Sequence, residues 1–382
     1  MTLKPNLINF PDLSHHAFQH PLDSQATAKL AKVPGLPKVI KFISQKSVEQ
    51  MLHYSNIAGK IRVSERQYPS LYKQYLRMAE VLDVRKLPSL YIETTPTINA
   101  FAAGIDNYSI VLCSGLIDIM DEDELLAILG HELGHVKCEH QLYKTTAMVL
   151  TGFGGTVLSQ LSQTGIPGVE FFVSAGRLGV EFAIMDWNRK AELSCDRAAL
   201  LATQDVDVVA RALAKLGGFS RRYEAELDLD EVENQANLYA ELGADSLFMK
   251  LLKLQSMMEA THPYPVVRVK EIRAWAKSEE YEQIIKGTYK KFTPKLTVAG
   301  WQDLTILTPR ARECPNPKCK YPCDENFTFC PSCQTNVRTG LLICGKCRHP
   351  VESDWTFCMS CAHSLQVTEE LPESTTKQIG SA

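Results

Sequence analysis

The sequence predicts an α+β protein: a mostly helical domain with a small β-sheet, followed by a small cysteine-rich module. Three observations carry this prediction. Apolar residues recur at helical spacing in many segments, two short runs near residue 100 are rich in β-branched and aromatic residues, and nine of the twelve cysteines lie between Cys314 and Cys361. A chain of 382 residues is long enough for one large domain and one small one.

The composition is that of an ordinary globular protein, with 45% hydrophobic residues and a formal net charge of −3. A charge so close to zero provides no global attraction to nucleic acid or anionic membrane. The first thirty residues are broken by Pro and His and lack a continuous apolar run, which argues against a secretory signal. We therefore expect a cytoplasmic chain whose paired cysteines bind metal.

The order of the predicted elements follows from the spacing of apolar residues. Helical patterns occur in VEQMLHYSNIAGKIRV and LYKQYLRMAEVLDV, and later in DWNRKAELSCDRAALLAT, VVARALAKLGG and LFMKLLKLQSMMEA. Between them, SLYIETTPTINAFAAG and YSIVLCSGLI indicate two strands of a small sheet. We divide the chain into an N-terminal arm (1–45) without assigned chemistry, the main domain (46–290), a linker (291–310), the cysteine module (311–365) and a disordered tail (366–382).

The segment DEDELLAILGHELGHVKCEH predicts a helix that carries a metal site. Asp121 is the candidate N-cap, and Glu124 three residues later completes a capping box. His131 and His135 lie four residues apart on one helical face, about 6 Å apart along the axis and within reach of a single ion. With Glu132 they form H-E-x-x-H, a motif in which two histidines bind zinc and the glutamate is a general base.

A catalytic zinc has three protein ligands, so the third must come from another segment. The best candidate is Glu192 in NRKAELSCDRAAL, with Asp196 one helical turn later on the same face. From this helix alone, a solvated surface acid is an equal alternative for Glu192. Cys138 also lies on the histidine-bearing face and is a less favoured soft ligand, whereas His140 is turned off that face and is expected to be structural.

Residues 145–169 carry no charge but include five Gly and one Pro. A membrane span needs about 20 mostly apolar residues, and this composition fits one poorly. We expect a buried hairpin or one that touches a membrane surface, and hence peripheral rather than spanning membrane association.

The cysteine module predicts a tandem zinc ribbon, because C-x-x-C pairs recur at a spacing typical of four-thiolate sites. The predicted ligands are Cys314, Cys319, Cys330 and Cys333 in the first ribbon and Cys344, Cys347, Cys358 and Cys361 in the second. Cys323 is a fifth thiol that is either free or a substitute for one of the first four. We expect these two zinc ions to be structural, and the ribbons to dock a protein partner rather than nucleic acid, since no aromatic stacking platform accompanies them.

HELGH, the E-x-x-x-D pattern of AELSCDRAAL and THPYPVVRV occur in an order that resembles the gluzincin metallopeptidases of peptidase family M48, which includes CAAX prenyl protease type I and heat-shock endopeptidases such as HtpX. The strand INAFAAG is similar too. The resemblance covers residues 98–269 and implies a zincin-like metallopeptidase domain. It implies a metalloendopeptidase that hydrolyses peptides or unfolded proteins through a zinc-bound water activated by a glutamate.

Position by position, the resemblance makes His131, His135 and Glu192 the ligands of one catalytic zinc. It makes Glu132 the general base that takes a proton from the attacking water. Asp196 becomes an outer acceptor that orients a ligating histidine.

The resemblance further implies that His262 stabilises the oxyanion and that Arg268 holds local structure. Asn99 and Ala100 fall on the edge strand that receives the substrate backbone. The chain departs from its membrane-embedded relatives in lacking convincing transmembrane helices, so prenylated substrates are not expected. Cys195 replaces a usually small apolar residue and is expected only to pack. A catalytically inert adaptor that acts through its ribbons is the alternative, but every residue that hydrolysis requires is present.

Overall fold

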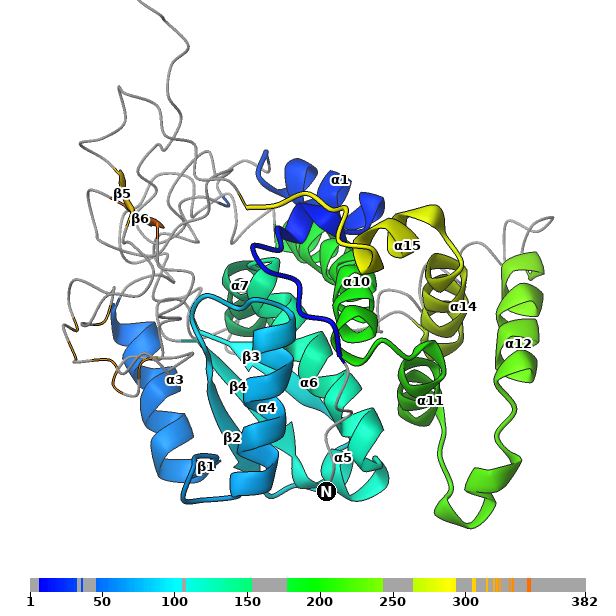
Figure 1. Ribbon diagram of the computed structural model, residues 1–382, viewed down its shortest axis with the longest axis horizontal. Helices are drawn as coiled ribbons and strands as arrows, with labels where there is room; N and C mark the ends of the chain where they lie inside the picture. Colours follow the sequence, from blue (N-terminus) through cyan, green and yellow to red (C-terminus); the bar gives the residue numbers. More distant parts are fainter. Residues whose placement is uncertain are drawn as a thin grey trace, which may run out of the picture.

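The computed structural model describes residues 7–32, 36, 46–104, 108–152, 177–242 and 264–292, with short pieces between 304 and 344. The α-helices are α1 (Pro21–Leu30), α3 (Lys46–Gly59), α4 (Pro69–Val81), α5 (Ser114–Ile119), α6 (Glu122–Lys137), α7 (Gln141–Gly152), α10 (Arg177–Thr203), α11 (Val206–Gly217), α12 (Leu229–Glu241), α14 (Pro265–Ala276) and α15 (Glu279–Ile285). The strands are β1 (Ile61–Arg62), β2 (Ser89–Glu93), β3 (Ala100–Ala103), β4 (Ser109–Cys113), β5 (Leu304–Ile306) and β6 (Leu342–Cys344). The predicted α+β class, mostly helical with one small main sheet, is confirmed (Figure 1).

The main sheet has the order β1-β2-β4-β3, with β2 and β4 parallel and the two outer pairs antiparallel. All five residues of β4 are buried, as expected for the continuous apolar run SIVLC in the middle of a sheet. The prediction of two strands was incomplete, because the turn residues around Pro96 divide the first run into β2 and β3. The C-terminal end of VEQMLHYSNIAGKIRV is also strand rather than helix, since α3 ends at Gly59 and β1 follows.

Helix α6 occupies the centre of the domain. Its start is confirmed: Asp121 Oδ1 accepts a hydrogen bond from the backbone N–H of Glu124 at 2.8 Å, and Glu124 Oε2 accepts from that of Asp121 at 2.9 Å. Every residue from Glu124 to Lys137 is buried. Helix α10 packs along α6, and β3 and α11 also contact it. This environment explains why the helix is apolar on nearly all sides.

Two glycines let α6 and α10 approach closely. A Cβ atom at Gly130 would lie 2.6 Å from Cβ of Ala202, and one at Gly134 would lie 2.6 Å from Cβ of Ala198 and 3.1 Å from Cα of Cys195. Carbon atoms do not pack at 2.6 Å, so a methyl group at either position would force the helices apart. The distance between the two helices is therefore set by glycines on α6 and small side chains on α10.

The N-terminal arm packs into the helical domain. Phe10 and Phe18 are fully buried, and the backbone N–H of Phe292 donates to the carbonyl of Asp12 at 2.7 Å. Helix α1 lies against α10 (Figure 1). Residues near both ends of the described domain thus share one core.

Several predicted segments lie outside the described residues: LFMKLLKLQSMMEA, His262, the uncharged stretch beyond Gly152 and the tail. Strand β5 lies within the segment predicted as a linker and pairs with β6, which ends at the predicted zinc ligand Cys344. Within the described part of the chain, no helix combines the length and apolarity needed to cross a bilayer.

Substitution of Gly134 by alanine tests the close packing of α6 and α10. We expect Gly134→Ala to lower the free energy of unfolding by about 1–3 kcal/mol, because the new methyl group overlaps Ala198. Thermal or denaturant unfolding measures the change.

Gly59→Ala is the matched control, because nothing lies within 4 Å of a Cβ atom there and only a small change should follow. Adding Ala198→Gly to Gly134→Ala removes the nearest clashing methyl and should recover part of the loss. Equal effects of Gly134→Ala and Gly59→Ala would show that the interhelical contact is not tight.

Candidate active site

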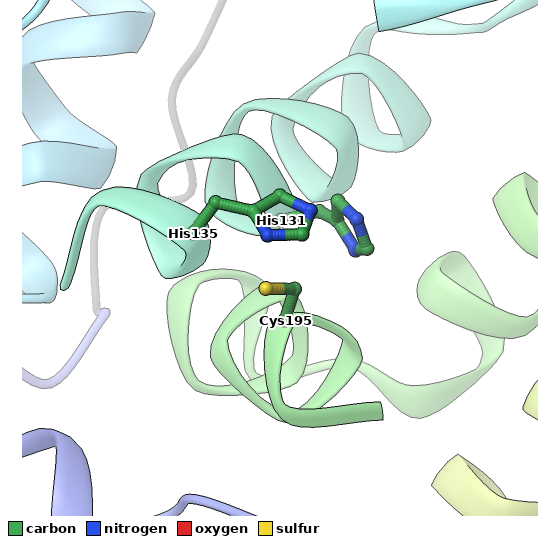
Figure 2. Close-up of side chains that lie close together, drawn as sticks. All are labelled: His131, His135 and Cys195. Atoms are coloured by element: carbon green, nitrogen blue, oxygen red, sulfur yellow. The ribbon is translucent and has the colours of Figure 1, made fainter. Parts of the chain in front are cut away.

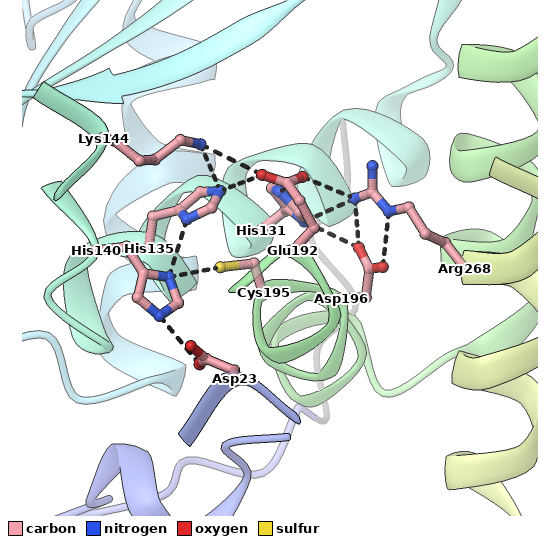
Figure 3. Close-up of polar contacts among 9 residues, drawn as sticks. All are labelled: Asp23, His131, His135, His140, Lys144, Glu192, Cys195, Asp196 and Arg268. Atoms are coloured by element: carbon pink, nitrogen blue, oxygen red, sulfur yellow. Dashed lines mark hydrogen bonds and ion pairs between the residues drawn. The ribbon is translucent and has the colours of Figure 1, made fainter. Parts of the chain in front are cut away.

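The contact between α6 and α10 brings His131, His135 and Glu192 together (Figure 3). Nε2 of His131 lies 3.2 Å from Oε2 of Glu192, and Nε2 of His135 lies 3.2 Å from Oε1 of the same carboxylate. Glu192 is only 1% exposed, so its alternative interpretation as a solvated surface acid is wrong. One carboxylate thus faces both imidazoles of the H-E-x-x-H motif.

The three side chains fit a zinc ion. Zinc–nitrogen and zinc–oxygen bonds of about 2.0–2.2 Å in tetrahedral geometry separate two ligand atoms by roughly 3.3 Å. The two nitrogen–oxygen distances of 3.2 Å agree with that value. Two imidazoles and a carboxylate are also a donor set of catalytic zinc sites.

The electrostatics differ at the two histidines, because burial and the ammonium group of Lys144 on α7 lower the pKa of His135 well below its usual value. Burial by itself lowers the pKa of His131, but the carboxylates of Glu192 and Asp196 raise it to about 9. The same carboxylates would stabilise a bound cation.

Asp196 and Arg268 fix the orientation of His131. Nδ1 of His131 lies 3.0 Å from Oδ1 of Asp196, and Arg268 donates to both carboxylate oxygens, from Nε at 2.8 Å and from Nη2 at 2.6 Å. Burial raises the pKa of Asp196, but Arg268 and His131 together hold it below its usual value. Arg268, expected only to hold local structure, also brings Nη2 to 3.4 Å from Oε2 of Glu192. Helix α14 thereby contributes to the centre.

Cys195 is a second candidate for the third ligand. Figure 2 shows its sulfur beside the two imidazoles, and its Sγ lies within 4.8 Å of a ring nitrogen of each. Metals bind the thiolate, whereas burial raises the pKa of this thiol well above its usual value. The carboxylate of Glu192, by contrast, faces both Nε2 atoms at 3.2 Å. Cys138, the alternative considered from the sequence, is a buried residue at the end of α6 and is not part of this group.

A cleft beside the centre encloses about 450 Å³, its open mouth included. Glu132, Asn99 and Ala100 line this cleft. Ala100 is the first residue of the edge strand β3, and Asn99 directly precedes it. Burial raises the pKa of Glu132, and its Oε2 has no hydrogen-bond partner among the described residues. The rest of the lining is mainly apolar and includes Leu116, Ile128, Val209, Ala212, Leu213 and Leu216.

Lys144 and Asp23 were not identified from the sequence, and His140 was expected to have only a structural role. Lys144, on α7, places Nζ 2.8 Å from Nε2 of His135 and 3.4 Å from Oε1 of Glu192. His140 contacts His135, and Asp23 contacts His140. Asp23 and His140 are 117 residues apart, so no sequence spacing predicts their contact. His140 follows the turn after α6, so helical spacing does not predict that it lies next to His135.

The described cysteines of the first predicted ribbon also gather. Sulfur atoms of Cys314, Cys323 and Cys330 lie within 4.8 Å of one another, and Sγ of Cys319 is 3.8 Å from that of Cys330. Cys333 and three ligands of the second ribbon, Cys347, Cys358 and Cys361, lie outside the described residues.

Comparison with known proteins identifies similar chains. Residues 65–276 match the model of Peptidase family M48. The chain is 34% identical over 286 residues to the plastoglobule-localized metallopeptidase 48, chloroplastic, of Arabidopsis thaliana. The aligned residues cover 74% of this chain and 79% of that protein. The chain is 27% identical over 224 residues to a protease HtpX homolog of Trichormus variabilis, covering 51% of this chain and 77% of the relative.

Lys144 allows a test of the electrostatics at the centre. Its ammonium group lies beside Nε2 of His135, so it opposes any cation bound there. Lys144→Met should therefore strengthen zinc binding by about tenfold, because a nearby positive charge is removed. Competition with a chelator of known affinity measures the change.

Lys190→Met is the control, since Lys190 lies on α10 and pairs with Asp186. This variant should bind zinc like the parent. Weaker zinc binding in Lys144→Met would instead make Lys144 a stabilising part of the site.

Proposed function

The chain belongs to peptidase family M48 and is a zinc metalloendopeptidase, and we propose that His131, His135 and Glu192 hold its catalytic zinc. The main support is one geometric observation: both Nε2 atoms lie 3.2 Å from oxygens of a single buried carboxylate. Peptides or proteins are its substrates. No observation favours the alternative of an inert adaptor.

Glu132 is the general base in this proposal. Zinc, when bound, would activate a water molecule and polarise the scissile carbonyl. The carboxylate of Glu132 lines the cleft, where it accepts a proton from the attacking water and delivers it to the leaving amine. The raised pKa of Glu132 brings its proton affinity closer to that needed for both steps.

The substrate binds in an extended conformation along β3. This strand is at the edge of the main sheet, and Asn99 and Ala100 border the cleft. Backbone hydrogen bonds to an edge strand require little of the sequence, whereas the apolar lining suits one apolar side chain next to the scissile bond. Stabilisation of the oxyanion by His262 is retained as part of the proposal.

Replacement of the base separates zinc binding from hydrolysis. Glu132→Gln keeps the shape of the side chain and removes the proton acceptor, so hydrolysis of casein or an unstructured peptide should fall by about a hundredfold or more. The zinc content and circular dichroism should match those of the parent.

Glu93→Gln serves as a control, because it makes the same chemical change in β2. It should leave hydrolysis unchanged. Full activity in Glu132→Gln would remove this residue from the mechanism.

The cysteine module holds two structural zinc ions in this proposal, in addition to the catalytic one. The proximity of Cys323 to Cys314 and Cys330 supports the alternative in which Cys323 substitutes for one of the four predicted ligands of the first ribbon. The ribbons dock a protein partner. The peptidase domain and the ribbons are proposed to be separate folding units, since each ribbon is held by its own metal.

Metal analysis tests this division. The purified chain should contain three zinc ions, and the double variant Cys344→Ser/Cys347→Ser should contain two while still cleaving a short peptide. Glu192→Ala should lose the catalytic zinc alone. A parent with two zinc ions, unchanged in Glu192→Ala, would contradict the assignment of the catalytic ligands.

The cellular site is proposed to be the cytoplasm, with peripheral contact to membranes. The Arabidopsis relative is named for the plastoglobule. In this chain, Tyr54 and Ile57 on α3 are large apolar side chains that are 74% and 61% exposed. Such residues suit contact with a lipid surface.

A further inference from the structure

His135, unlike His131, does not contact a carboxylate through its Nδ1 atom in the described contacts. Nδ1 of His131 reaches Asp196 directly. Nδ1 of His135 lies 3.1 Å from Nδ1 of His140, and Nε2 of His140 lies 3.1 Å from Oδ2 of Asp23 (Figure 3). The two histidines of the motif therefore reach a carboxylate by different routes, one direct and one through a second imidazole.

The turn after α6 places His140 beneath His135. Glu139 has a φ of 60°, the left-handed conformation, and follows the C-cap residue Cys138. The N–H of His140 donates to the carbonyl of His135 at 3.0 Å, and that of Glu139 donates to the carbonyl of Val136 at 3.2 Å. This is the hydrogen-bond pattern of a Schellman motif, whose left-handed position is usually glycine. A glutamate there is held in a costly conformation, which suggests that the position of His140 matters.

The role of His135 determines which ring nitrogens along this series of contacts carry a hydrogen. If His135 binds zinc through Nε2, its Nδ1 carries a hydrogen and donates it to Nδ1 of His140. His140 must then accept at Nδ1, so its own hydrogen is on Nε2, which donates to Asp23. A neutral His140 thus links the Asp23 carboxylate to His135 through two consecutive hydrogen bonds.

The geometry points to Asp23 and His140 as positioning residues that orient His135 for zinc. This inference rests on the proposed function, because it takes His135 as a zinc ligand. Asp23 lies outside the family-matched residues 65–276, so a residue of the N-terminal arm supports the catalytic centre.

The surroundings of Asp23 are built to hold a carboxylate. It is fully buried and accepts hydrogen bonds from Ser194 Oγ at 2.6 Å, Gln19 Nε2 at 3.1 Å and Thr27 Oγ1 at 3.2 Å. Burial alone would raise the pKa of Asp23, but the hydrogen bonds that it accepts from His140, Ser194 and Gln19 lower it. Asp23 is therefore ionised at neutral pH.

The ring of His140 is also fixed in place. It is 2% exposed, and it meets the edge of the Trp187 ring at a centroid distance of 5.4 Å and an angle of 85°. Trp187 in turn donates from Nε1 to Thr27 Oγ1 at 2.8 Å, which ties α10 to α1. The sulfur of Cys195 lies 3.5 Å from Nδ1 of His140. These contacts leave His140 one orientation, in which it bridges His135 and Asp23.

Zinc affinity of full-length variants tests the inference without relying on activity. Asp23→Ala and His140→Leu should each weaken zinc binding by about tenfold in competition with a chelator, because outer partners of ligating histidines typically contribute that much. His140→Gln should bind nearly as tightly as the parent, since its amide can accept from His135 and donate to Asp23. The visible spectrum of the cobalt-substituted protein should change in Asp23→Ala and His140→Leu only.

His20→Ala is the matched control for loosening of α1. The side chain of His20 caps that helix and pairs with Glu271, and it contacts neither Asp23 nor His140 in the described interactions. Only the backbone carbonyl of His20, which the substitution keeps, accepts from the N–H of Asp23, at 3.0 Å. The substitution should destabilise the arm and leave zinc affinity unchanged. Zinc affinity within twofold of the parent in both Asp23→Ala and His140→Leu would overturn the inference, as would equal losses in His140→Leu and His140→Gln. Failure of the parent itself to bind zinc at His135 would instead overturn the proposed function.

Discussion

The structure depends on the close contact between α6 and α10. Gly130 and Gly134 face Ala198, Cys195 and Ala202, and this pairing of small residues brings the two backbones near each other. Only at that separation can the carboxylate of Glu192 meet the imidazoles on the neighbouring helix. Gly134 of HELGH and Gly130 directly before it thus have a structural role as definite as the chemical role of the histidines, because they set the distance between those histidines and Glu192.

The surrounding elements maintain that contact and orient its side chains. Helix α14 supplies Arg268, which holds Asp196 with two hydrogen bonds, and Asp196 in turn holds His131. The strand β3 packs on α6, and its first residue, Ala100, lines the cleft. The centre is therefore formed by segments from most of the described domain, each of which places one or two polar groups.

Local rules were enough to predict α6 and its motif. The capping box, the four-residue histidine spacing and the pattern around Glu192 each depend on neighbours within one helix, so the sequence displays them directly. The division into β2 and β3 was missed because β-branched and aromatic residues occur throughout the run, which was therefore assigned to one strand despite Pro96. Asp23, His140 and Lys144 could not be found in the same way, since tertiary packing and a left-handed residue at Glu139 determine where they lie.

The link between Asp23 and His140 has a consequence for the evolution of this chain. Each residue satisfies a buried polar group of the other. Replacing Asp23 alone leaves Nε2 of His140 without this hydrogen bond in a buried site, and replacing His140 alone removes one of the donors to the Asp23 carboxylate. The two positions are expected to covary among relatives, an acid at the first accompanying a histidine at the second. Relatives that lack the N-terminal segment must then stabilise this side of the centre by other means.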